Sequence, residues 1–107
     1  MRHYNFGATQ TIDWRWDPAK ERLNRSKHRL SLAAAVPVFL DALATSRRDP
    51  DSREERWQTI GSAGDFAVVI VIHTEPVRQP DGRMVGRIIS VRKATRHERK
   101  AYEEGAF

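Results

Sequence analysis

The 107-residue chain is predicted to form one small α+β domain, in which N-terminal helices pack on an antiparallel sheet of three to five strands and a C-terminal helix follows. Its length suffices for one hydrophobic core but not for two. Because 39% of the residues are apolar and three are tryptophans, a packed core is expected rather than disorder. Strand and helix patterns occur in separate blocks, which favours α+β over alternating α/β.

Composition restricts the classes of partner and chemistry. Nineteen Lys and Arg stand against fourteen Asp and Glu, giving a net charge of +5, so nucleic acid is the leading partner class. The absence of cysteine excludes disulfides, thiolate zinc sites and a cysteine nucleophile, and the histidine spacing predicts no metal site. The longest apolar run, 66–72, is too short to cross a bilayer, so a cytoplasmic protein without membrane contact is expected.

The chain begins with a polar, aperiodic stretch. Residues 1–10 are interpreted as a flexible extension and residues 11–107 as the domain. Within the domain, Thr11 to Trp16 alternates apolar and polar side chains, the period of two that predicts a short, half-buried strand.

Two helices are predicted next. Asp17 is a suitable N-cap and Pro18 suits the first helical position, so a helix is expected to run to about Arg29. Ser31 can cap a second helix, whose apolar residues follow a three-four spacing. Pro37 lies inside that pattern and is expected to kink or shorten the helix.

Strands dominate the middle of the chain. The strongest pattern is predicted to be the central strand because its β-branched residues serve both faces. A flexible hairpin loop rich in proline and glycine, 75–86, is expected between the central strand and the last strand. In order, the predicted strands are Ala42–Arg47 (weak), Arg56–Ile60 closed by Gly61, Phe66–Thr74 (central) and Ile88–Val91.

The last strand runs into a helix through a dense group of cations. Thr95 and Glu98 have the spacing of a capping box, and Gly105 is placed to end the helix. Such a charge density is costly unless the surface meets an anion, so this edge is predicted to face phosphate. Its cations are Arg87, Arg92, Lys93, Arg96, Arg99 and Lys100.

Several ordered blocks resemble one family. WDPAK, KH, VFLD, EERWQTIG, VVIVIHTE and RIISVRKATRHERKAYE occur in that order, and over residues 13–104 the chain resembles the BrnT family, the toxins of type II toxin–antitoxin modules. The resemblance implies a RelE-like fold and a metal-independent endoribonuclease that halts translation. It also implies a BrnA-type ribbon-helix-helix antitoxin, expected in a 2:2 complex that binds operator DNA.

The chain departs from the family pattern at two positions. Arg29 and Leu30 follow the Lys27–His28 pair where the family usually has glycine and a small residue, so the helix is expected to lack its C-cap glycine. Pro37 interrupts a helix that is normally unbroken. Both departures bear on local geometry more than on family membership.

Metal-free RNA cleavage needs a base for the ribose 2′-OH, cations for the phosphorane and an acid for the leaving oxygen. Arg92 ends the strand in the family's IS-x-R block and is predicted to contact the scissile phosphate; otherwise it covers the sheet edge or pairs with a carboxylate. Arg96, at the helix start, is a second candidate for the same role.

Three further residues are catalytic candidates. Glu54 and Arg56 share one strand face, where Glu54 could act as the base and Arg56 as a phosphate clamp, although a simple ion pair would explain both. His73 ends the central strand and could act as acid or base, or pack in the core as a hydrogen-bonded residue.

The remaining cations are assigned to RNA binding. Lys27 and His28 close the first helix, where positive charge also stabilises the helix dipole. Lys93, Arg99 and Lys100 are expected to make non-specific phosphate contacts or to form a solvated face. The aromatic residues on apolar stripes are assigned to packing rather than to base stacking: Trp14, Trp16, Phe39, Trp57 and Tyr102.

Two other hypotheses stay open on the sequence. The chain could be a catalytically silent basic module that binds nucleic acid or an acidic partner. It could also be a toxin inactivated by the changes at Arg29 and Pro37 that survives as an antitoxin-binding subunit. Loss of Arg92 separates the first from an enzyme, because a catalytic site should lose cleavage while keeping most of its binding.

Overall fold

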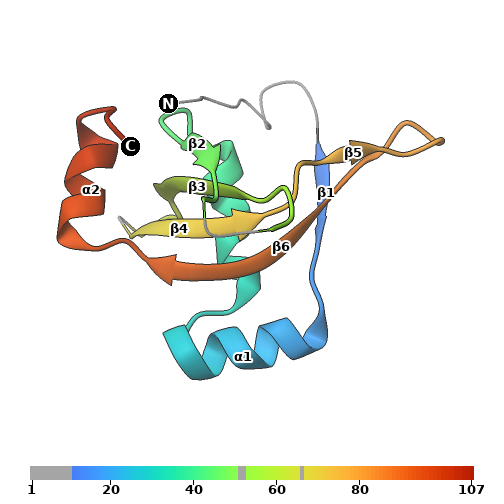
Figure 1. Cartoon of the computed structure of the whole chain (residues 1–107), viewed down its shortest axis with the longest axis horizontal. Helices are drawn as coiled ribbons and strands as arrows, with labels where there is room; N and C mark the ends of the chain where they lie inside the picture. Colours follow the sequence, from blue (N-terminus) through green and yellow to red (C-terminus); the bar gives the residue numbers. More distant parts are fainter. Residues whose placement is uncertain (1–10, 51–52, 66) are drawn as a thin grey trace.

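The computed structural model describes residues 11–50, 53–65 and 67–107. The predicted extension, 1–10, lies outside the described residues. The expected α+β class is confirmed (Figure 1). The elements are β1 (Ile12–Arg15), α1 (Pro18–His28), the 3-10 helix η1 (Leu32–Leu40), β2 (Thr45–Arg48), β3 (Trp57–Ser62), β4 (Val68–His73), β5 (Val77–Arg78), β6 (Met84–Lys93) and α2 (Arg96–Glu103).

The sheet is mixed, so the prediction of an antiparallel sheet is wrong. Its order is β1-β6-β4-β3-β2, which confirms the predicted central strand as β4. β1 pairs parallel with β6, from Ile12 opposite Met84 to Arg15 opposite Arg87. No short turn joins these two strands, so nothing local dictates their relative direction, and the pairing comes from tertiary packing.

The segment 75–86, predicted as a flexible hairpin loop, does form a hairpin, but part of it is β-strand rather than loop. Val77 pairs with Val85 and Arg78 with Met84, so β6 begins well before the predicted Ile88. Gly82 supplies the left-handed conformation of the turn, at φ 89°. Pro80 and Gly82 lie in the turn, β-pairing resumes on both sides of it, and Gly86 is part of β6.

The second predicted helix is a 3-10 helix. Ser31 is its N-cap as predicted, since its side chain accepts a hydrogen bond from the Ala33 N–H. Pro37 sits inside it. A Pro ring lacks an N–H and crowds the preceding turn, so the tighter helix accommodates it where a regular α-helix would kink.

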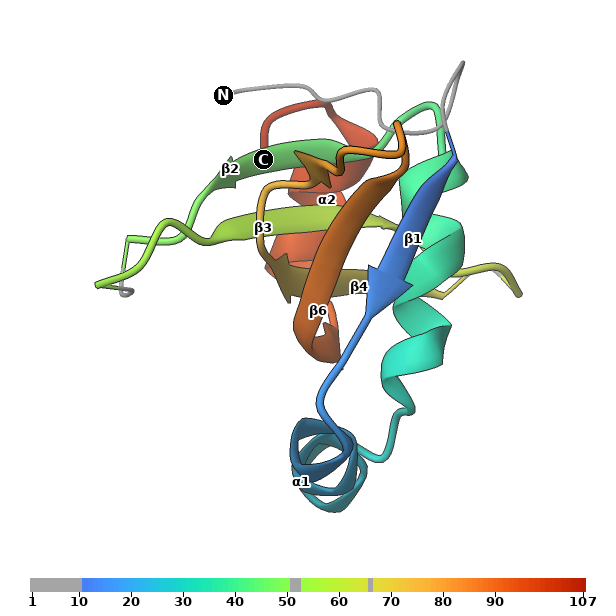
Figure 2. The ribbon, with the colours of Figure 1, turned by 90° about the vertical axis from the view of Figure 1, so that its right-hand side faces the viewer.

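The two faces of the sheet are covered differently. η1 lies along one face, where Leu32 and Val38 pack on strand residues such as Val71 (Figures 1 and 2). On the opposite face a smaller cluster of Ile60, Ile70 and Phe107 lies at the end of the sheet near α2. The C-terminal part of the chain therefore covers one end of that face.

α1 is joined to the edge of β6 by one side chain, Asn24, which is 3% exposed. Its Oδ1 accepts from the Val91 N–H at 3.0 Å, and its Nδ2 donates to the carbonyls of Val91 and Leu30, each at 2.9 Å. The amide thus pairs with Val91 as a neighbouring strand would. This bond places the C-terminal end of α1 beside the C-terminal end of β6 (Figure 1).

The C-cap residue of α1 is Arg29 and not glycine, as the sequence predicted. Arg29 is left-handed, at φ 61°, and its N–H still bonds to the Arg25 carbonyl. Placing a residue other than glycine in the left-handed backbone conformation costs about 1 to 2 kcal/mol, whereas glycine adopts this conformation without strain. Arg29→Gly is therefore expected to raise the free energy of unfolding by about 0.5 to 1 kcal/mol in urea denaturation, after the greater flexibility of glycine in the unfolded chain is deducted.

The matched control for that prediction is Arg22→Gly, which removes the same side chain from the interior of α1. This control is expected to lose about 1 kcal/mol, because glycine is a poor helix former. If both variants were destabilised equally, the left-handed backbone at Arg29 would not be a source of strain.

Candidate functional site

Arg92, near the end of β6, forms a two-pronged ion pair with Glu98 of α2. Nη1 lies 2.8 Å from Oε1 and Nη2 lies 2.9 Å from Oε2, and the arginine side chain is 39% exposed. Hydrogen bonds from Arg92 lower the pKa of Glu98 to about 2, and the same bonds raise the pKa of Arg92. Of the interpretations left open for Arg92, pairing with a carboxylate is the one observed in this structure.

Glu98 is itself anchored by the start of α2. Its Oε1 accepts from the Thr95 N–H at 2.8 Å, and the Thr95 hydroxyl accepts from the Glu98 N–H at 3.1 Å, which confirms the predicted capping box. The Glu98 carboxylate thus both caps α2 and pairs with Arg92. The sequence predicted the cap, whereas the contact with Arg92 depends on the fold.

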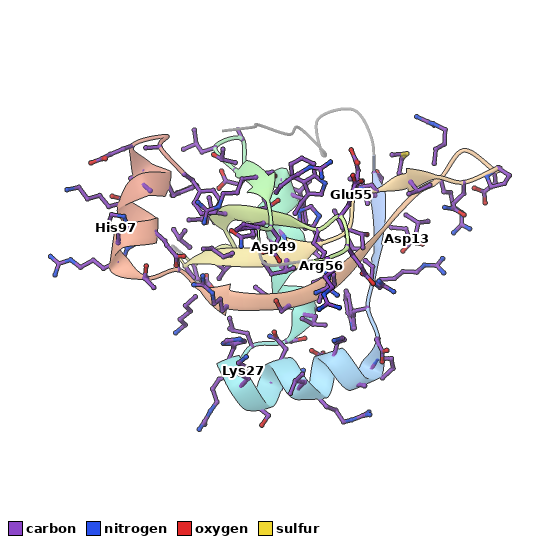
Figure 3. All side chains as sticks on the ribbon, in the orientation of Figure 1. Asp13, Lys27, Asp49, Glu55, Arg56 and His97 are labelled. Carbon is purple, nitrogen blue, oxygen red and sulfur yellow. The ribbon has the colours of Figure 1, made fainter. Side chains whose placement is uncertain are left out.

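The histidine at the end of α1 lies within electrostatic range of Arg92. Burial lowers the pKa of His28, and the positive charges of Lys27 and Arg92 lower it further, so the two cations lie within electrostatic range of the imidazole. Figure 3 shows Lys27 on α1 below β6. His28 is only half-buried, so its imidazole can be reached from solvent. Because its pKa is lowered, the imidazole is neutral at neutral pH and can act as a base.

Next to this histidine is a hollow of about 140 Å³ between α1 and β6. Leu23 and Ile89 provide apolar walls, and Ser90 lies on the β6 side. Its cationic lining comes from Lys20 and Lys27, and the neutral His28 lies beside them. The predicted RNA-binding pair Lys27 and His28 thus lines this hollow, and the predicted catalytic Arg92, which is not part of its lining, lies within electrostatic range of His28.

A second, larger groove of about 710 Å³ runs along α2. It contains the predicted catalytic Arg96 and the predicted RNA-binding Arg99 and Lys100, all exposed. Lys93 is also exposed, at the end of β6. Tyr102 lines the groove and packs against the Ile60 cluster, in line with its assignment to packing.

Tyr102 also joins α2 to the far end of η1 through Asp41. Its hydroxyl donates to Asp41 Oδ2 at 2.6 Å, and that carboxylate accepts from the N–H groups of Ser62 and Leu43 as well. Burial and the Asp41 carboxylate raise the pKa of Tyr102 to about 12. Burial opposes ionisation of Asp41, but these hydrogen bonds outweigh it and lower its pKa. Sequence spacing does not predict this link, because Asp41 and Tyr102 are far apart in sequence.

Glu54 and Arg56 lie at a different end of the sheet. Glu54 Oε2 and Arg56 Nη2 are 3.6 Å apart, so the ion pair left open for them is present. By strand register, Arg56 lies two strands across and four residues along from Arg92, a Cα separation of roughly 16 Å. Figure 3 shows Arg56 toward the β5 end, away from His97 of α2. The structure does not bring this pair to Arg92.

Arg56 has one unusual atom. Its Nε is buried and has no hydrogen-bond partner in the described part of the chain. The side chain as a whole is 31% exposed, so its guanidinium reaches the surface while the Nε is shielded.

His73 lies in the core, 0% exposed. Its Nδ1 is 2.7 Å from the Thr74 carbonyl, which can only accept, so Nδ1 carries the proton and Nε2 accepts from the Thr59 hydroxyl at 2.6 Å. Its ring packs edge-on against Trp14 and Phe39. Burial lowers the pKa of His73 to about 4. These contacts favour the interpretation of His73 as a packed core residue.

Tryptophan packing agrees with the sequence analysis. Trp14 stacks on Phe39 with ring centroids 4.1 Å apart, and Trp57 is 2% exposed. Trp16 is partly buried against the core cluster beneath η1.

The described residues contain neither a cluster of metal ligands nor a membrane-spanning helix. No three His, Cys, Asp or Glu side chains in 11–50, 53–65 and 67–107 gather closely enough to hold a metal ion. No helix in those same ranges is long and apolar enough to cross a membrane.

Comparisons with known proteins match this arrangement to one family. The crystal structure of the Brucella abortus ribonuclease toxin BrnT superposes with a TM-score of 0.58 and 24% sequence identity, covering 80% of this chain and 100% of that chain. Among curated proteins, no match was found. The family model for the ribonuclease toxin BrnT of type II toxin–antitoxin systems matches residues 16–98, well over half of the chain. The chain therefore belongs to the BrnT family of ribonuclease toxins, which confirms the resemblance seen in its sequence.

Proposed function

We propose that the chain is a metal-independent endoribonuclease that cleaves RNA, and so inhibits translation, at the end of β6, where His28 lies within electrostatic range of Arg92. The observation that carries this proposal is the hollow between α1 and β6, which Lys27 and His28 line and whose histidine lies within electrostatic range of Arg92. A neutral imidazole and a guanidinium together supply a proton acceptor and an anion-binding group. Family membership supports RNA as the substrate.

In this mechanism His28 accepts the proton of the ribose 2′-OH, and the resulting oxygen attacks the adjacent phosphorus. The phosphorane gains negative charge, which Arg92 and Lys27 stabilise. The positive charges that keep His28 neutral before reaction also favour its return to neutrality. It would then deliver the proton to the departing 5′-oxygen, directly or through water.

The other predicted residues take roles away from the reacting phosphate. Arg96, Arg99 and Lys100 in the α2 groove, with Lys93 nearby, bind further phosphates of the same strand. The Cα of Arg56 lies roughly 16 Å from that of Arg92, so Arg56 and its ion-pair partner Glu54 are proposed to contact RNA beyond the reacting phosphate. His73 is proposed to support the core rather than to react.

A toxin of this family requires an antitoxin. We propose a BrnA-type ribbon-helix-helix protein, in a 2:2 complex that represses its own operator. The basic surface around Arg92 and along α2 would attract an acidic antitoxin segment, which would inhibit by covering the site. A catalytically silent basic module is the second candidate, because Glu98 already neutralises Arg92 in this structure.

The test is cleavage of a defined RNA by the purified chain in EDTA. The parent is expected to cut, and Arg92→Ala is expected to reduce kcat/KM by about 100-fold, because it removes the main charge facing the phosphorane. Matched folding of the two proteins is checked by circular dichroism and urea denaturation. The control Arg22→Ala removes one exposed arginine from α1 and is expected to change cleavage less than 3-fold.

Two outcomes would contradict the proposal. A parent that binds RNA but cuts neither free RNA nor RNA on translating ribosomes would favour the silent module. Cleavage that needed added divalent metal and stopped in EDTA would contradict metal independence.

A further inference from the structure

We propose that Glu98 is a positioning residue: it holds the Arg92 guanidinium so that one unoccupied edge faces the substrate phosphate. The inference rests on the proposed cleavage site, and it assigns a task to a carboxylate that would otherwise merely cancel the charge of Arg92. The inference is based on which N–H donors of Arg92 are hydrogen-bonded in the ion pair and which are not.

The ion pair uses the end of the guanidinium. Glu98 accepts one hydrogen bond from Nη1 and one from Nη2, at 2.8 and 2.9 Å. The second Nη1 hydrogen points to the Lys93 carbonyl at 3.3 Å. Because a guanidinium has five N–H donors, the Nε–H and one Nη2–H remain, and no hydrogen bond from Nε to another described residue occurs.

These two remaining donors lie on the same edge of the planar group. That edge has the spacing of two phosphate oxygens, so it can bind phosphate in the same two-pronged manner in which the other edge binds Glu98. The substrate therefore need not displace Glu98. One arginine can hold a carboxylate and a phosphate at once.

Glu98 can orient Arg92 because its own carboxylate is held in place by the start of α2. Its side chain is 20% exposed, and Oε1 receives the Thr95 N–H as well as Arg92. The chain of contacts runs from the start of α2 through Glu98 to the guanidinium. An arginine without this partner would sample many rotamers, so orienting it on binding would cost conformational entropy.

Charge also separates positioning from binding. Glu98 removes one positive charge from a surface that should attract RNA, which weakens ground-state attraction. Lys27 and Arg92 both lie within electrostatic range of His28, so Lys27 keeps a positive charge in this neighbourhood. Glu98 thus weakens RNA binding while it orients Arg92, so its replacement is expected to lower kcat without raising KM.

The test is Glu98→Gln, which keeps the capping box, since glutamine accepts the Thr95 N–H equally well. We expect kcat to fall about 10-fold while KM falls or stays unchanged, because Arg92 loses its orientation but the surface gains net positive charge. Glu55→Gln is the control: it is an exposed glutamate paired with Arg48, and it makes the same charge change without altering kcat.

A purely structural role for Glu98 would show differently. In that case kcat and thermal stability would fall in parallel, and kcat would also fall when Glu98→Gln is added to Arg92→Ala. Positioning through Arg92 predicts no further loss of kcat in the double variant. Such a further loss would overturn the inference.

A binding measurement separates this inference from the cleavage proposal. A DNA oligonucleotide lacks the 2′-OH and cannot be cleaved by this route, so it reports on phosphate contact alone. The Arg92 Nε–H resonance in nitrogen-edited NMR is expected to shift on its addition, and to shift less in Glu98→Gln. An unshifted resonance overturns the positioning role; a shifted resonance in a parent that cuts no RNA overturns only the proposed activity.

Discussion

Replacing Asn24 with leucine is expected to lower the free energy of unfolding by about 3 to 5 kcal/mol. The substitution removes all three hydrogen bonds between α1 and its surroundings at this position, and leaves the Val91 N–H, the Val91 carbonyl and the Leu30 carbonyl without their partners. Each buried group left unpaired costs about 1 to 3 kcal/mol, which leucine burial offsets only in part. Urea denaturation and the melting temperature, expected to fall by roughly 15 to 25 °C, measure the effect.

Two variants make that result specific. Asn24→Asp retains an acceptor for the Val91 N–H but loses both donors, so an intermediate loss is expected. Ser26→Ala changes an exposed residue on the same helix and is expected to alter stability by less than about 0.5 kcal/mol. Should Asn24→Leu be as stable as the parent, the α1–β6 edge would not depend on this amide, and the placement of His28 beside Arg92 would need another cause.

The parts of the fold that follow from short-range chemistry were predictable. Asp17 caps α1 and the Thr95–Glu98 box caps α2 because each cap needs only residues within three positions. The central strand β4 was visible as a β-branched run. The parallel pairing of β1 with β6 was not, because its partners, such as Ile12 and Met84, lie far apart in sequence and are joined by no turn.

The candidate site divides in the same way. Arg92 and the Lys27–His28 pair could be singled out from motif and charge, and the fold brings them to one end of β6. Periodicity placed Glu54 and Arg56 on a shared face but could not say how far along the sheet that face lies from Arg92. That distance depends on the register of three strands, which no local pattern encodes.

The two departures from the family pattern are accommodated locally. Arg29 takes the left-handed conformation that a glycine would take, and Pro37 fits a 3-10 helix. His28, immediately before Arg29, still ends α1 beside Arg92, because Asn24 anchors the helix upstream of the change. An inactivated toxin is thus distinguished by its cleavage assay and not by a misplaced helix.

His73 makes the protein sensitive to mild acid. Its pKa is about 4 in the folded protein against 6.5 for an exposed histidine, so the unfolded chain binds more protons between these values. Stability is therefore full above pH 6.5 and decreases as the pH falls. The loss is expected to be about 1 kcal/mol by pH 5.5 and about 3 kcal/mol once the pH is below 4.

His73→Gln, which cannot titrate, is expected to lose most of this slope between pH 7.5 and pH 5, whatever its stability at pH 7.5. Urea denaturation at half-unit pH intervals measures it. Paired carboxylates such as Glu98, with a pKa of about 2, lose their contribution to stability only below about pH 4.5, so they do not affect the slope between pH 7.5 and pH 5.

His28 also has a lowered pKa, but it is half-buried, so the control His28→Gln should remove only a small part of the slope. If His28→Gln flattened the profile and His73→Gln did not, the buried imidazole would not be the source of acid sensitivity. The proton would then be taken up next to Arg92, at the proposed site of cleavage.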